Sequence, residues 1–287
     1  MLNRVLSSIV YLAIFLLAIF FGIRYPLVMD ILLSVIFIIS FYEMYKAYHK
    51  NYNKTCNILL IVYGVTMLLS NYLIRYLDFT MALYVCLVFL FSILGFIIYI
   101  KQFINFDSFK DYLLAIVYPT IPLISLFMIN SFDKGSIIIF YIFAVSALTD
   151  TFAFFGGKII GGRKLCKISP NKTISGAISG LVGGILGSIL VYVLLHSAGF
   201  MSFFDPTFYQ LSSGLEEMIM MTSIWYFILL GLASSVVNQV GDLFASSIKR
   251  EANLKDFGYI LPGHGGILDR IDGLMFVSVL VLIIIYL

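Results

Sequence analysis

Charged residues are scarce in this sequence. Only 11% of the 287 residues are Asp, Glu, Lys or Arg, whereas 61% belong to the hydrophobic set, and the mean hydropathy is +1.04. A soluble domain carries about 25% charged and about 45–50% apolar residues, so the composition excludes an ordinary globular protein, and it also excludes an acidic disordered chain. The net charge of +3 is small and dispersed, without the basic face that nucleic-acid binding needs. No nucleic-acid partner is therefore expected.

Cysteines are few, and several familiar catalytic motifs are absent. The three cysteines, Cys56, Cys86 and Cys166, lie far apart without a C-x-x-C pair, so no disulfide framework or zinc site is predicted. The sequence contains no G-x-S-x-G elbow and no H-E-x-x-H pair, and its glycine-rich loops lack the G-x-x-x-x-G-K-[ST] order. These absences argue against a serine hydrolase, a zinc protease and a P-loop enzyme.

Long apolar runs dominate what is present. Runs near 20 residues recur along the chain, and each is long enough to cross a hydrocarbon core of about 30 Å. Nothing shows the short alternating segments of a transmembrane barrel. The sequence therefore predicts an all-α, polytopic integral membrane protein with about nine transmembrane helices. The expected spans are 5–23, 27–45, 58–75, 79–100, 112–130, 136–155, 174–198, 222–241 and 269–287.

Lysine and arginine are distributed unevenly between alternate loops. Only Arg24, Arg75 and Lys134 fall on one side of the predicted spans, and the other 15 of the 18 basic residues fall on the opposite side. Because basic loops stay in the cytoplasm, we expect a multi-pass protein of the cytoplasmic membrane with a cytoplasmic amino terminus and an external carboxyl terminus.

The distribution of polar residues predicts one membrane domain over residues 1–287 with two unequal parts. Residues 1–145 are mostly lipid-compatible, variable transmembrane helices, whereas residues 146–272 hold most of the glycines, cytoplasmic charges and membrane-level acids. We therefore expect the catalytic region in residues 146–287, with its active site facing the cytoplasm.

Carboxylates at membrane depth mark the candidate site, because each costs several kcal/mol unless it is paired, hydrated or bound to a metal. The candidates are Asp30, Glu43, Asp150, Asp242, Asp269 and Asp272. Asp30 and Glu43 lie near span ends, where an interfacial structural role is as reasonable as a functional one. Asp150 lies toward the cytoplasmic end of its span, before an aromatic-glycine turn, and a functional role is favoured there.

Spacing brings several of these polar residues onto shared helical faces. Asn238, Asp242, Ser246 and Lys249 follow one another at i, i+4, i+8 and i+11, and Asp269 and Asp272 are spaced at i, i+3. Two helices could thus present carboxylates toward one point at the cytoplasmic boundary. Oxygen ligands beside lysine and arginine suit Mg²⁺ bound together with substrate phosphates.

Two glycine-rich segments flank these helices. One runs through 156–164 and continues into Ser169-Pro170-Asn171-Lys172-Thr173, and the other is Pro262-Gly263-His264-Gly265-Gly266. Dense glycines permit close approach of the backbone to a ligand. The first segment, however, is equally consistent with an ordinary basic cytoplasmic loop.

The second segment belongs to a stretch that resembles the signature of phosphatidate cytidylyltransferases, also called CDP-diacylglycerol synthases. The resemblance runs in register from Ser246 to Asp272 through 246–250, 255–258 and 261–272. Asp150 with its aromatic-glycine turn, and the segment ending in Lys172 and Thr173, are similar to a second conserved region of that family. The resemblance covers residues 146–287. This chain departs from the family pattern at Ser175, where Glu is common, and at Asn238, where Asp often stands.

The resemblance implies a reaction of CTP with phosphatidate, a membrane lipid, that gives CDP-diacylglycerol and pyrophosphate with Mg²⁺ and a second cation as candidate cofactors. It implies a catalytic set of Asp242, Ser246, Lys249, Arg250, His264 and Asp269. The substrate-binding set is Asp150, Arg163, Lys172, Thr173, Lys255, Asp256 and Arg270. We assign Asp242 and Asp269 as metal ligands, the latter matching a metal residue of that family, with Asp272 as a third candidate.

Two alternatives to this function stay open. The first is another CTP-dependent lipid enzyme, of the polyprenol kinase or CDP-archaeol synthase type, which must also bring a nucleoside triphosphate to a lipid acceptor. The choice of acceptor depends on the apolar residues that line the site. A cation-coupled transporter could use the same acids, but transporters often have broken helices in both halves, whereas the polar residues here crowd into one.

A row of glycines in the expected span 174–198 is relevant to whether the protein forms a homodimer. It consists of Gly176, Gly180, Gly183, Gly184 and Gly187. Such a face allows close helix packing, either against a second copy or within one chain.

Overall fold

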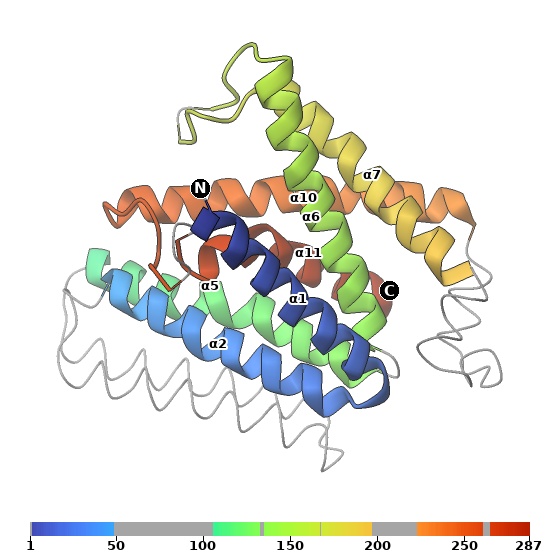
Figure 1. Cartoon of the computed structure of the whole chain (residues 1–287). Coiled ribbons are helices and arrows are strands. Elements are labelled where there is room, and N and C mark those ends of the chain that lie inside the picture. Colours follow the sequence, from blue (N-terminus) through green and yellow to red (C-terminus); the bar gives the residue numbers. More distant parts are fainter. Residues whose placement is uncertain (1, 49–105, 133–134, 167, 197–222, 261–264) are drawn as a thin grey trace.

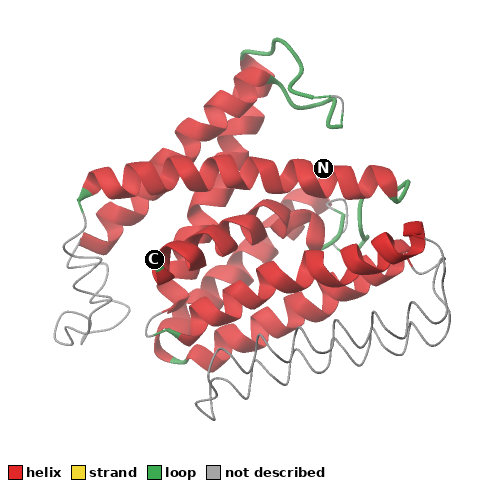
Figure 2. Ribbon diagram, turned by 180° about the vertical axis from the view of Figure 1, so that it is seen from behind, coloured by secondary structure: helices red, strands yellow, loops and turns green. Residues whose placement is uncertain are grey.

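The computed structural model of this chain describes residues 2–48, 106–132, 135–166, 168–196, 223–260 and 265–287. Within these ranges every regular element is an α-helix (Figure 2). The helices are α1 (Leu2–Arg24), α2 (Pro26–Tyr48), α5 (Phe106–Ser131), α6 (Gly135–Ile159), α7 (Ile174–His196), α10 (Ile224–Glu251) and α11 (Leu268–Tyr286).

The all-helical prediction is confirmed for the described part of the chain, and each of these helices corresponds to one expected span. Four of the described helices, α2, α6, α7 and α10, are long and apolar enough to cross a membrane. Shorter apolar stretches occur at Leu12–Arg24 in α1 and Val117–Ser131 in α5. The expected spans 58–75 and 79–100 lie outside the described residues, so the total of nine stays a prediction.

The helices form two groups that meet along α10 and along α6 (Figure 1). Helices α1, α2, α5 and α11 pack side by side, and α2 contacts α5 while α5 contacts α11. Among the described helices, α6 and α7 form the most extensive pair, and they project beyond α10 to a loop at their tip. Helix α10 contacts both α7 and α11, and α6 itself contacts α1, α5 and α11, so the paired helices are joined to the rest of the bundle through α10 and α6.

Small residues allow the close approach of α7 to its neighbours. A Cβ at Gly184 would overlap Ser235 of α10, and a Cβ at Gly183 would overlap Phe152 of α6. A Cβ at Gly231 of α10 would lie 2.9 Å from the backbone carbonyl oxygen of Gly184 in α7. Of the two alternatives for the glycine face of α7, packing within one chain is therefore the one observed. The homodimer stays a prediction.

Helix α10 extends ten residues beyond the predicted end of its span at residue 241. It begins after Ser223, whose side chain accepts a hydrogen bond from the amide of Trp225 at 3.3 Å, and its last turn contains Lys249 and Arg250. Cations are favourable at this negative end of the helix dipole. The predicted span ends where hydropathy falls and charges begin, and the helix continues from there into the polar region. As the spacing predicted, Asp242, Ser246 and Lys249 therefore lie on one helix.

Candidate active site

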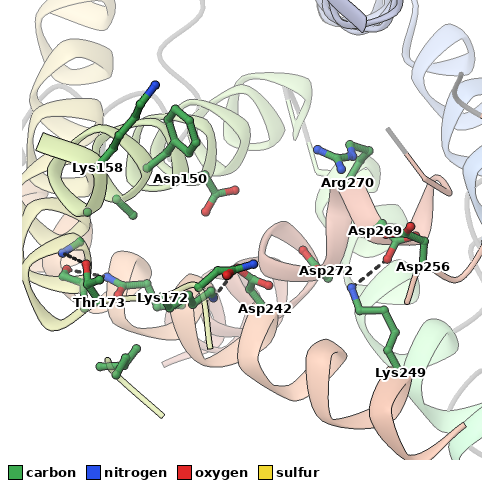
Figure 3. A pocket seen from close by; sticks show the side chains of 18 residues that line it. Asp150, Lys158, Lys172, Thr173, Asp242, Lys249, Asp256, Asp269, Arg270 and Asp272 are labelled. Atoms are coloured by element: carbon green, nitrogen blue, oxygen red, sulfur yellow. Dashed lines mark hydrogen bonds and ion pairs between the residues drawn. The ribbon is translucent and has the colours of Figure 1, made fainter. Parts of the chain in front are cut away.

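A cavity of about 670 Å³ lies where the end of α6, the start of α7, the second half of α10 and the start of α11 converge (Figure 3). Its volume is in the range of ordinary small-molecule sites, about 300–1,000 Å³. Its charged lining residues are Asp150, Lys158, Lys172, Asp242, Lys249, Asp256, Asp269, Arg270 and Asp272. Carboxylates and cations in one cavity suit a ligand that carries both phosphates and a metal ion.

Asp269 occupies the most constrained position in this cavity. Its Oδ1 accepts a hydrogen bond from Lys249 Nζ at 2.8 Å, and its Oδ2 accepts from the amides of Phe257 at 2.8 Å and Gly266 at 2.9 Å. Its side chain is only 3% exposed. Gly265 has a φ of +85°, and a Cβ there would lie 3.0 Å from Asp269 Oδ2, so glycine suits this turn both conformationally and sterically. The turn thus holds this carboxylate in one orientation.

A second ion pair joins the loop before α7 to α10. Lys172 Nζ contacts Asp242 Oδ2, and the two side chains are 28% and 32% exposed. Exposed pairs of this kind contribute little to stability, about 0–1 kcal/mol. A phosphate or a cation can therefore replace either partner at low cost.

Asp150 of α6 turns its side chain toward the space between Asp242 and Asp272 (Figure 3). Its Oδ1 accepts a hydrogen bond from Asn238 Nδ2 at 2.8 Å. Asn238 is fully buried, and its Oδ1 has no hydrogen-bond partner among the described residues. An ionised aspartate at this position could not donate to Asp150. The asparagine that departs from the family pattern at position 238 therefore provides the hydrogen-bond donor for Asp150.

The loop between α6 and α7 is folded back on itself and carries Lys172 into the cavity. The amide of Leu165 donates to the carbonyl of Lys172 at 2.9 Å, and Thr173 Oγ1 accepts from the amide of Gly176 at 3.1 Å, which caps α7. Ser175, the other departure from the family pattern, donates its hydroxyl to the carbonyl of Gly161. This serine therefore ties the start of α7 to the far side of the loop.

Most of the residues predicted from the sequence meet in this cavity. It is lined by Asp150, Lys172, Thr173, Asp242, Lys249, Asp256, Asp269, Arg270 and Asp272. Four other predicted residues do not line it, since Arg163, Arg250 and Lys255 are exposed elsewhere and Ser246 is half-buried on α10. His264 lies outside the described residues.

Three polar lining residues, Lys158, Asn171 and Gln239, were not among the predicted site residues. Gln239 precedes Asp242 by three residues on the same helical face, a spacing that could have indicated it. Lys158 is the basic residue in the last turn of α6, eight residues after Asp150, and its position in the glycine-rich loop sequence was its only signal.

The three candidate metal ligands, Asp242, Asp269 and Asp272, all line the cavity. Asp272 is 9% exposed, and its Oδ1 also accepts the amide of Gly273 at 2.8 Å. Among the described residues, no three His, Cys, Asp or Glu side chains are grouped closely enough to hold a metal ion by themselves. Mg²⁺ usually takes one or two carboxylates and completes its shell with phosphate and water oxygens. The oxygen donors present therefore fit Mg²⁺ that arrives with a nucleotide.

Comparison with known proteins gives one family. The sequence profile of the cytidylyltransferase family matches residues 2–287. The phosphatidate cytidylyltransferase of Rickettsia conorii is 34% identical over 180 residues, which are 61% of this chain and 70% of that protein. The enzyme of the same name from Helicobacter pylori is 29% identical over 177 residues, 62% of this chain and 57% of that protein. The one from Brucella abortus is 37% identical over 142 residues, 49% of this chain and 44% of that protein.

Proposed function

Because this chain belongs to the cytidylyltransferase family, we propose that it transfers the cytidylyl group of CTP to phosphatidate, giving CDP-diacylglycerol and pyrophosphate. The observation that carries the proposal is the cavity that gathers five aspartates with Lys158, Lys172, Lys249 and Arg270. The proteins of Rickettsia, Helicobacter and Brucella that it resembles are named for this reaction. Their names favour phosphatidate over polyprenol or archaeol acceptors.

The reaction brings two anions together. A phosphate oxygen of the lipid forms a bond to the α-phosphorus of CTP, and the bond from that phosphorus to the bridging oxygen of the β-phosphate breaks. Pyrophosphate leaves with the electron pair of that bond. Since phosphoryl transfer depends mainly on positioning and charge neutralisation, the four cations of the cavity are the main contribution of the protein. Lys172 and Lys249 are held in place by Asp242 and Asp269, and each can turn from its carboxylate to a phosphate.

The aspartates of the cavity suit the metal that nucleotides carry. We propose that Asp242 and Asp272 hold Mg²⁺ with the triphosphate, and that Asp269 joins them when Lys249 turns to a phosphate. Bound Mg²⁺ would neutralise developing charge on the phosphates and on the pyrophosphate that leaves. A second cation remains a prediction.

The orientation of the chain is proposed from charge and helix polarity together. The cavity is formed by the ends of α6 and α10 and by the starts of α7 and α11, so all four helix ends lie on one side of the bundle. The same side carries the basic residues that predict a cytoplasmic location. We therefore place the cavity at the cytoplasmic boundary, where CTP arrives from water and the lipid enters from the adjacent leaflet.

The test is release of pyrophosphate by the purified protein in mixed micelles that contain CTP, phosphatidate and Mg²⁺. We expect release to require all three components and to fall about 100-fold or more in Asp269→Asn, a loss of the size expected when a charge-stabilising group at the reacting phosphates is removed. Asp30→Asn is the matched control, because Asp30 lies on α2 and accepts a hydrogen bond from Asn130 at 2.7 Å, away from the cavity lining. Folded protein that releases no pyrophosphate with phosphatidate, but does so with a polyprenol or archaeol acceptor, would replace the substrate assignment.

A further inference from the structure

Glu43 of α2 lies at the start of α11, although 224 residues separate it from that helix in the sequence. Its Oε1 accepts a hydrogen bond from the amide of Ile267 at 3.0 Å, and its Oε2 accepts from the amide of Leu268 at 2.9 Å. The side chain is 2% exposed. A charged group so deeply buried needs specific partners, and these two amides supply them.

This contact replaces the local cap that α11 lacks. The first amides of a helix have no partner within the helix, and a Ser, Thr, Asp or Asn at the N-cap usually accepts from one of them. The N-cap residue of α11 is Ile267, which makes no side-chain cap. A carboxylate at this end also interacts favourably with the helix dipole. Glu43 therefore does from a distant helix what a capping residue ordinarily does from the preceding position.

Two glycines in the stretch that resembles the family signature, Gly258 and Gly266, leave space for the carboxylate of Glu43. A Cβ at Gly258 or at Gly266 would overlap the carboxylate of Glu43. Neither glycine is in the positive-φ region, unlike Gly265. The absent side chains at Gly258 and Gly266 therefore serve to admit Glu43 rather than to allow an unusual backbone.

The capped turn is continuous with the candidate site. The amide of Gly266 donates to Asp269 Oδ2, and the next two amides donate to Glu43. The other oxygen of Asp269 holds Lys249, and Asp269 and Lys249 appear together at one side of the cavity (Figure 3). Three consecutive amides are thus divided between the carboxylate of the site and the carboxylate of α2.

We propose that Glu43 is a positioning residue, which clamps the turn at 266–268 and thereby sets the orientation of Asp269 and Lys249 in the cavity. Glu43 is not among the residues that line the cavity, so it acts through the turn and not on the substrate. The kinetic consequence rests on the proposed function, but the structural consequence does not. Through Glu43, the amino-terminal half of the chain also contributes to the site, although the sequence analysis interprets that half as lipid-compatible helices.

The first experiment replaces Glu43 by Gln, which keeps the shape but offers one acceptor oxygen where the carboxylate offers two. We expect kcat for cytidylyl transfer to fall about 10- to 100-fold, the scale expected for misplacement of a reacting group by about 1 Å, while KM for CTP changes less. Hydrogen–deuterium exchange of the amides at 266–268 should become faster. Asp30→Asn is the control, because it is the same isosteric change on the same helix, about 20 Å along the axis from Glu43, and it should change neither readout.

The second experiment approaches the contact from the turn. Gly266→Ala alone should lower activity and loosen the turn, because its Cβ overlaps the Glu43 carboxylate. Combined with Glu43→Ala, which removes that carboxylate, it should cause little further loss. A double variant whose losses multiply would overturn the clamp, because residues in direct contact should be strongly non-additive.

The outcomes separate the clamp from the proposed function. Faster exchange at 266–268 in Glu43→Gln supports the clamp even if the wild-type protein transfers no cytidylyl group. An active wild type together with unchanged kcat and unchanged exchange in Glu43→Gln overturns the clamp and leaves the proposed function standing. If Glu43→Gln does not yield folded protein, Gly266→Ala decides, since normal activity and normal exchange in that variant exclude a tight contact.

Discussion

Lys249 of α10 and Asp269 of α11 form an ion pair of 2.8 Å whose side chains are 12% and 3% exposed. This pair joins two helices at the cavity and differs from the pair of Lys172 with Asp242, in which about a third of each side chain is exposed. Removing one partner of a buried pair leaves an uncompensated charge, whereas an exposed carboxylate is stabilised by water. The two lysines are therefore expected to contribute differently to the stability of the fold, although both line the same cavity.

The first prediction compares these two lysines by substitution with Met. Lys249→Met should destabilise the protein by up to about 3 kcal/mol, since Asp269 keeps its two amide donors but loses its cation. Lys172→Met should cost about 1 kcal/mol or less. Thermal unfolding midpoints in detergent, measured at one scan rate, would show the difference. Equal shifts for the two variants would contradict the assigned burial of the pairs.

The second prediction concerns Asn238, whose side-chain amide donates to Asp150. Asn238→Asp removes this donor and adds a buried carboxylate beside Asp150, so stability without divalent cations should fall by about 1–3 kcal/mol. Since a cation that binds the folded state stabilises it, Mg²⁺ should raise the unfolding midpoint of Asn238→Asp more than that of the wild type. Asn238→Ala is the control, because it removes the donor without adding a charge. Equal Mg²⁺ shifts in all three proteins would argue against Mg²⁺ near Asp150.

The third prediction concerns Ser175 and the loop that carries Lys172. Ser175→Ala removes the hydrogen bond to the carbonyl of Gly161, so the loop should lose order, and KM for CTP should rise about 3- to 10-fold, the equivalent of a net hydrogen bond of about 0.5–1.5 kcal/mol. Thr151→Val is the matched control, because it removes a hydroxyl bond to the carbonyl of Ala147 within α6. A Ser175→Ala variant with the KM of the wild type would show that this tie does not position Lys172.

The fourth prediction tests the close packing of α7. Gly184→Ala should destabilise the protein by about 1–3 kcal/mol, the usual cost of overpacking, because the added Cβ would overlap Ser235. Val182→Ala, at a position of the same helix that is 49% exposed, should cost less. The oligomeric state measured in detergent should be the same for both variants. A Gly184→Ala variant of normal stability that shifts an oligomer to monomers would instead place this face between copies of the chain.

Part of the candidate site was predictable because its spacing is local. The positions of Asp242 and Lys249 on one helical face follow from the helical period, and both line the cavity. Ser246 belongs to the same face by that rule, yet it does not line the cavity. A periodic pattern places residues on one face of a helix, but it does not indicate at which position along the helix axis that face contacts a neighbouring helix. That depends on where α10 crosses α7 and α11.

The sequence by itself determined the helical class of the described residues, their spans, the region that holds the cavity and most of the charged residues that line it. Hydropathy and spacing determine these features because both act within one helix or across one bilayer thickness. Only the tertiary structure decided that Glu43 caps a helix 224 residues away, that Lys249 pairs with Asp269, and that the glycines of α7 pack inside the chain. These contacts depend on the mutual placement of helices, which is set by the packing of all the side chains between them and leaves no periodic signal in any one segment.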